Sequence, residues 1–123
     1  MADLLFWLYL SNSVLLINHE IDSAYWNEWE LFRLPGGITG YLLIHFPLLF
    51  FVLLGLVLVS KHSLSGLIFS IILSFSGIFA FSIHTFFLQK GYSQFDKPIS
   101  KFILTTILIV SIFQFTVTIY LMT

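Results

Sequence analysis

Three long stretches of the chain contain no Asp, Glu, Lys or Arg, and they run over residues 34–60, 62–89 and 102–123. Each stretch exceeds the roughly 20 mostly apolar residues that an α-helix needs to cross a bilayer core of about 30 Å. We therefore predict three membrane-spanning helices, over about residues 37–60, 63–89 and 99–122.

The apolar stretch nearest the N-terminus is shorter. It runs over residues 4–18, and the polar residues His19, Glu20 and Asp22 follow it at once. Such a stretch can span only if its helix continues through these polar residues or if the bilayer thins locally. We predict a first span over about residues 4–25, which makes the fold all-α: a single transmembrane domain of four helices over the whole chain.

Short polar segments connect the predicted spans. The first linker, 26–37, ends in the breaker Pro35-Gly36-Gly37 and carries aromatic residues suited to the lipid headgroup layer. The second linker is a tight turn at 61–63. The third covers 90–98, where Pro98 suits the first turn of the last helix.

Lys and Arg are distributed unequally between the two ends of the predicted bundle. One end carries Arg33, Lys90, Lys97 and Lys101, whereas the end with both chain termini carries Lys61 alone. Cytoplasmic loops of membrane proteins carry an excess of Lys and Arg. The first end is therefore predicted to be cytoplasmic, and both termini are predicted to face away from the cytoplasm.

Composition agrees with a lipid environment and excludes several function classes. Of the 123 residues 59% are hydrophobic and 9% are charged, whereas a soluble domain carries about 25% charged residues. The chain has no Cys, which excludes disulfides, thiolate zinc sites and cysteine nucleophiles. Its net charge of -1 provides no basic surface for nucleic acid. The N-terminus has no positively charged region, so we do not expect a cleaved signal peptide.

Three of the four histidines fall toward one membrane face once the spans are threaded. His19 lies near the cytoplasmic end of the first span, and His84 lies about one turn before the end of the third. His45 lies about eight residues into the second span, hence roughly 10 Å below the same surface. His62 falls in the opposite turn. Ionisable groups inside a membrane are costly and usually functional, but chance alone often places three histidines on one side, so their sidedness does not by itself establish a site.

Two acidic residues strengthen this grouping. Asp22 follows His19 by three positions and shares its helical face, whereas Glu20 is rotated by about 100° and could reach a neighbouring helix. Facing helices of bundles build metal sites from imidazoles and carboxylates. We predict a divalent metal site with the ligands His19, Asp22, His45 and His84, and with Glu20 or Asp22 as the catalytic acid or base. Three histidines with a carboxylate or water suit zinc, and a mixed set with open positions suits iron or manganese.

The alternative is a polar layer at the membrane interface that binds nothing. It accounts well for His19 and Glu20, which fall where the headgroup layer would begin. It accounts less well for His45, which lies deeper among apolar residues. Pro47 follows two residues later and frees the carbonyl of Leu43, which becomes available as an acceptor or ligand. His45 is therefore the sharper indication of function.

Small and polar residues form stripes at helical spacing along the third and fourth spans. The third span carries Gly66, Ser70, Ser74, Gly77 and His84, and the fourth carries Ser111, Gln114 and Thr118. Small residues in a stripe let helices approach closely, and polar ones hydrogen-bond across helices. We interpret most of these residues as packing contacts, and leave both roles open for His84.

The segment 22–30 is dense in acids and aromatics. It could recognise a partner or a lipid headgroup, or it could be an interfacial helix in which Trp residues anchor and acids are exposed. We interpret Glu28 and Trp29 as interfacial residues, and leave both roles open for Asp22 and Glu30.

The runs His19-Glu20-Ile21-Asp22, Tyr25 to Phe32 and Leu34-Pro35-Gly36-Gly37 resemble small bacterial membrane proteins grouped as a family of unknown function. That family shares a His-Glu-hydrophobic-Asp signature followed by a Glu-Trp pair. The resemblance covers about the first third of the chain and implies a bacterial source and a four-span fold, with no established activity. The histidines and Asp near one face also look like the zinc sites of membrane ceramidases and their receptor relatives, which have seven spans and a different motif order.

Three functions are compatible with these features. The first is a metal-dependent membrane enzyme that hydrolyses a lipid, with metal-bound water as the nucleophile. The second is a haem-binding subunit with His45 and His84 as axial ligands. The third is a non-catalytic assembly or interaction subunit whose small-residue stripes contact other helices. We expect membrane lipids as partners, together with a second copy of the chain or helices of another protein, and we expect the bacterial inner membrane as the location.

Overall fold

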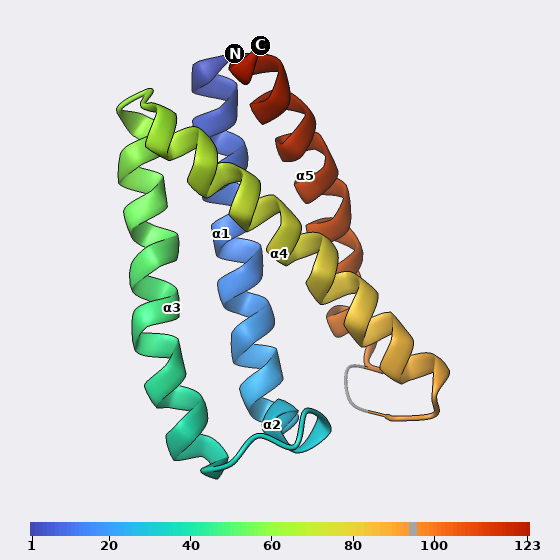
Figure 1. Cartoon of the computed structure of the whole chain (residues 1–123). Helices are drawn as coiled ribbons and strands as arrows, with labels where there is room; N and C mark the ends of the chain where they lie inside the picture. Colours follow the sequence, from blue (N-terminus) through green and yellow to red (C-terminus); the bar gives the residue numbers. More distant parts are fainter. Residues whose placement is uncertain (94–95) are drawn as a thin grey trace.

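The structure is a computed structural model that describes residues 1–93 and 96–123, and no strand occurs in those residues. Its helices are α1 (Ala2–Tyr25), α2 (Glu28–Leu31), α3 (Gly37–Ser60), α4 (Leu64–Gln89) and α5 (Pro98–Met122) (Figure 1). The all-α prediction is confirmed, and the four long helices begin and end within two residues of the ranges predicted for the spans. The predicted third linker includes residues 94–95, which lie outside the described part of the chain.

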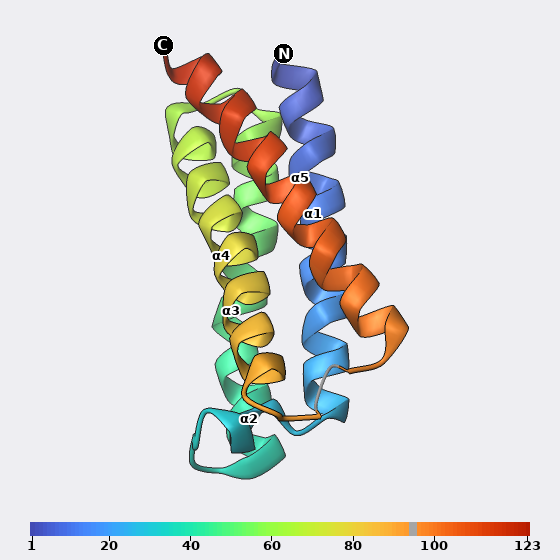
Figure 2. The same ribbon diagram turned by 90° about the vertical axis from the view of Figure 1, so that its right-hand side faces the viewer.

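The four long helices form a bundle in which chain neighbours run in opposite directions (Figures 1 and 2). α1 packs against α3 and α5, and α4 packs against the same two helices. Both termini lie at one end of the bundle, and α2 lies at the other end. α3 and α4 meet at the turn after Ser60 and diverge toward the α2 end (Figure 1).

Three of the helices, α3, α4 and α5, are long and apolar enough to cross a membrane, which is consistent with an integral membrane protein. Large hydrophobic side chains such as Phe50, Phe79 and Phe102 are exposed on their outer surfaces. α1 is not one of these three helices, because polar residues such as Asn12 and His19 interrupt its apolar sequence.

A buried polar network joins α1, α4 and α5. Asn12 Nδ2 donates to Ser111 Oγ at 3.1 Å and to Gln114 Oε1 at 2.9 Å. Gln114 Nε2 in turn donates to Ser70 Oγ at 2.9 Å, and the Ser70 and Thr118 hydroxyls are 2.8 Å apart. All five residues are 0% exposed. The polar stripe predicted on the last helix therefore serves interhelical hydrogen bonding.

The small residues of α4 let neighbouring helices approach closely. A Cβ atom at Gly66 would lie 2.6 Å from the carbonyl oxygen of Leu58 on α3, which is too close for a side chain without a backbone shift. The whole stripe from Gly66 to His84 is buried against the bundle, as its spacing predicted. The last residue of this buried stripe is His84, which lies near the α2 end of the bundle.

Candidate metal centre

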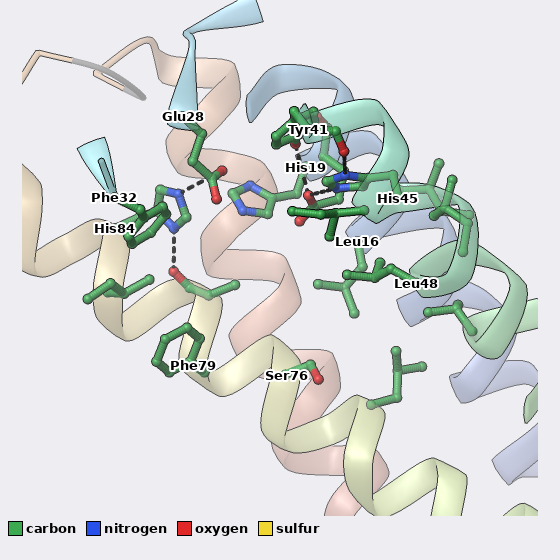
Figure 3. Close-up of a pocket in the computed structure, with 18 of the residues that line it drawn as sticks. Leu16, His19, Glu28, Phe32, Tyr41, His45, Leu48, Ser76, Phe79 and His84 are labelled. Atoms are coloured by element: carbon green, nitrogen blue, oxygen red, sulfur yellow. Dashed lines mark hydrogen bonds and ion pairs between the residues drawn. The ribbon is translucent and has the colours of Figure 1, made fainter. Parts of the chain in front are cut away.

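A cavity of about 630 Å³ lies between α1, α3 and α4, toward the α2 end of the bundle (Figure 3). Most of its lining is aliphatic or aromatic, but six titratable side chains line one part of it: His19, Glu20, Glu28, Tyr41, His45 and His84. Apolar cavities of this size with a few converging polar groups are typical ligand sites.

Local sequence features explain how these side chains meet. α1 ends at Tyr25, and Asn27 takes the left-handed conformation with φ 55°, which Asn adopts more readily than most residues. The chain reverses there, so α2 begins with Glu28 near the end of α1. His45 lies on α3, which stays helical through Pro47.

His19, Glu28 and His84 form the tightest group of possible metal ligands. One ligand atom from each of them lies within 4.8 Å of the other two. The two imidazole rings meet edge to face with centroids 4.6 Å apart, and His84 Nε2 lies 3.4 Å from Glu28 Oε2. Glu28 points toward both rings (Figure 3). His19 and His84 are 1% and 2% exposed, and Glu28 is partly buried.

The hydrogen bond on the far side of His84 determines what its Nε2 can do. His84 Nδ1 lies 2.7 Å from the carbonyl oxygen of Ala80, and because a carbonyl only accepts, Nδ1 donates its proton there. Nε2 of the neutral ring is then an acceptor that faces a second acceptor, the Glu28 carboxylate. Such a pair needs a cation between the two atoms or a proton on the ring. A backbone carbonyl that fixes the other ring nitrogen is the usual arrangement around metal-binding histidines.

The spacing between these two atoms fits a shared metal ion. Tetrahedral zinc binds histidine nitrogen and carboxylate oxygen at about 2.0–2.2 Å, which places two ligand atoms about 3.4 Å apart. His84 Nε2 and Glu28 Oε2 are 3.4 Å apart. His19 brings the group to three protein ligands, the number typical of catalytic zinc sites that keep a fourth position for water.

His45 belongs to a second group in the same cavity. Its Nδ1 lies 2.7 Å from the Tyr41 carbonyl oxygen, and its Nε2 lies 2.5 Å from Glu20 Oε2. The Tyr41 hydroxyl also donates to Glu20 Oε2, at 2.9 Å. The spacing between His45 and Glu20 is too short for two ligands of one ion and fits a proton held between ring and carboxylate.

Glu28 lies in α2, outside the three apolar helices, and its surroundings favour the carboxylate. Burial raises the pKa of Glu28. Interactions with His84 and Ser23 and the charges of His84 and His19 lower this pKa, and their combined effect is larger than that of burial. The net pKa lies below the ordinary value of 4.5. Glu28 is therefore ready to ligate a cation at neutral pH.

The structure brings some of the predicted ligands together and separates others. His19 and His84 lie in one cluster, whereas His45 lines the same cavity but contacts Glu20. Asp22 is not among the cavity-lining residues. Its Oδ2 is buried and has no hydrogen-bond partner within residues 1–93 and 96–123.

Glu28 is a member of this group of possible ligands that was not predicted from the sequence. It was expected to be an exposed interfacial acid, but its side chain is only 14% exposed and lies against His84. The available signal was Asn27, whose tolerance of the left-handed conformation allows the chain to turn back over the bundle.

The chain belongs to a family of unknown function, DUF6713, whose model matches residues 5–121. This match includes every residue of the two groups described above and confirms the prediction of a family without an established function. The comparison with curated proteins finds no match, and neither does the comparison with solved structures.

Proposed function

We propose that the chain is a metal-dependent membrane enzyme that hydrolyses a lipid, with a divalent ion, most suitably zinc, bound by His19, Glu28 and His84. The observation that supports this proposal most strongly is the 3.4 Å separation of His84 Nε2 and Glu28 Oε2 next to a buried third ligand.

A bound zinc ion would make its water a nucleophile near neutral pH and polarise a carbonyl group. In the hydrolysis, the hydroxyl of that water joins the acyl carbon, the bond from this carbon to the leaving oxygen or nitrogen breaks, and the remaining proton passes to the leaving group. Glu20 and His45 line the same cavity and are hydrogen-bonded to each other, so we assign the proton transfer to them. Asp22, which does not line the cavity, has no place in this scheme.

We further propose that α1 is a fourth span, with both termini outside the cytoplasm of a bacterial inner membrane. α1 has 24 residues and would extend for about 36 Å, more than the bilayer core. Its polar residues Asn12 and His19 are buried in the bundle, whereas Trp7, Val14 and Ile21 are exposed at seven-residue spacing. A helix with polar residues inward and an apolar stripe outward suits contact with lipid.

The two alternative functions find less support in the contacts. A haem held by His45 and His84 would require each Nε2 to leave the glutamate that it now faces. A purely structural assembly subunit would need packing stripes, which the chain has, but it would not need three possible ligands within 4.8 Å of one another.

Elemental analysis of purified, zinc-reconstituted protein tests the metal site. We expect about one zinc per wild-type chain, a large loss in Glu28→Gln, and no loss in Glu30→Gln, which changes an exposed glutamate of the same short helix. Hydrolysis of carboxylic ester and amide lipids in liposomes should follow zinc content across the three proteins. A wild type that binds no stoichiometric metal would refute the proposal, and so would equal zinc loss in both variants.

A further inference from the structure

The apolar part of the cavity extends from the metal-ligand cluster along the space between α3 and α4. Its lining runs from Tyr41 to Val52 on α3 and from Ile72 to His84 on α4, and Leu16 contributes from α1. Twelve positions on α4 correspond to about 18 Å of helix. The cavity is therefore elongated along the helices, with all its titratable residues within the portion that contains His84 and His45 (Figure 3).

The rims of this cavity face outward from the bundle. Leu48 on α3 is 41% exposed, and Phe75 and Phe79 on α4 are 56% and 64% exposed. In a membrane these side chains would contact lipid, because α3 and α4 are apolar enough to span it. An amphiphile could therefore pass sideways from the bilayer into the cavity without its chain crossing water.

The polar part of the cavity indicates the chemistry of the ligand. Its charged groups are glutamates and histidines, and no Lys or Arg lines the cavity in the described part of the chain. Phosphate groups are usually bound by Arg or Lys, so a phosphate headgroup lacks its usual partners here. A neutral carbonyl group needs only a cation and hydrogen-bond donors, which a loaded metal cluster and the Tyr41 hydroxyl would provide.

We propose that the substrate is a neutral membrane lipid with one aliphatic chain, joined to its polar group by a carboxylic ester or amide bond. Its chain lies between α3 and α4, and its carbonyl lies at His19, Glu28 and His84; this assignment rests on the proposed metal-dependent function. A volume of about 630 Å³ suits one small ligand rather than a two-chain lipid.

Photolabelling in zinc-loaded nanodiscs of phosphatidylcholine tests the assignment. The probes are three palmitoyl lipids with a diazirine in the chain: a monoacylglycerol ester, an N-acylethanolamine amide and lysophosphatidic acid. Labelled positions are mapped by mass spectrometry. We expect the ester or the amide to label α3 and α4 at the cavity, and lysophosphatidic acid to label these positions about tenfold less, equivalent to about 1.4 kcal/mol of binding free energy.

Two serines of α4 provide a matched pair of variants. Ser76 lines the cavity and Ser82 does not, yet both are exposed and both donate to the carbonyl four residues earlier. Ser76→Trp should fill the cavity and reduce labelling by the preferred probe about tenfold, whereas Ser82→Trp should leave it unchanged. Leu48→Trp fills the cavity from α3, and it provides an independent test in case Ser76→Trp does not fold. All three should keep wild-type zinc content.

The outcomes separate this inference from the proposed function. Zinc binding with equal labelling in Ser76→Trp, Leu48→Trp and wild type would overturn the substrate assignment, as would preference for lysophosphatidic acid. Labelling as expected with no zinc in the wild type would instead overturn the metal-dependent function.

Discussion

Replacing Asn12 with Leu should destabilise the bundle, because Asn12 connects α1 to α5 in its fully buried interior. Leu has the γ-branched shape of Asn but is larger and makes no hydrogen bonds, so it removes the donations from Asn12 Nδ2 to Ser111 and Gln114 and adds crowding at a buried position. Interhelical hydrogen bonds in membrane proteins contribute about 0.6 kcal/mol on average and up to about 1.7. Gln114 Oε1 also loses its donor, which costs about 1–3 kcal/mol in a buried setting. Two lost hydrogen bonds and one unsatisfied buried acceptor together give an expected loss of unfolding free energy of about 2–4 kcal/mol.

Reversible unfolding in mixed micelles at increasing dodecyl sulfate measures this loss through the fluorescence of the three Trp residues. Asn18→Leu is the matched control, since Asn18 lies on the same helix but is exposed. It should change the free energy of unfolding by less than about 0.5 kcal/mol. Equal effects of the two substitutions, or none from Asn12→Leu, would show that α1 does not pack into the bundle through this network.

Three further predictions concern helix packing, topology and pH. Gly66→Ala should destabilise the chain by about 1–3 kcal/mol, because the added Cβ would lie against the backbone of α3. Ser65→Ala, at an exposed neighbouring position, should have little effect in the same unfolding assay. In a chain without Cys, Asp3→Cys and Glu30→Cys should react with a membrane-impermeant maleimide from opposite sides of oriented vesicles; reaction from one side would contradict a spanning α1. With chelator present, the stability advantage of wild type over Glu28→Gln should be complete above pH 4.5 and decrease as pH falls through the lower folded pKa. Parallel pH profiles of unfolding would contradict the lowered pKa.

The helices could be predicted from the sequence because composition in a membrane is a strong constraint. A stretch of more than 20 residues without charge has few alternatives to a spanning helix. The first span was the weakest prediction because its apolar stretch is short and His19, Glu20 and Asp22 follow it at once. In the structure His19 is fully buried in the bundle, as is Asn12 earlier on the same helix. Which way a polar residue points depends on its partner helices, and a single sequence does not contain that information directly.

The site could be predicted only in part, for a similar reason. Threading the spans gives the depth of each histidine but not its direction around the helix, so His45 was placed with His19 and His84. In the structure α3 and α4 diverge toward this end, and His45 contacts Glu20 instead. Glu28 was missed because the reversal at Asn27, which moves it over the bundle, has no strong pattern in the sequence.

Zinc affinity of the wild type, His84→Ala and His45→Ala, measured on detergent-purified protein by calorimetry and elemental analysis, tests the central claim most directly. His84 offers Nε2 to the metal-ligand cluster, whereas His45 is committed to Glu20. We predict about one zinc per wild-type chain, a loss of affinity greater than about 100-fold in His84→Ala, and a much smaller change in His45→Ala. Equal loss in the two variants, or a wild type that binds no zinc, would contradict a metal centre formed by His19, Glu28 and His84.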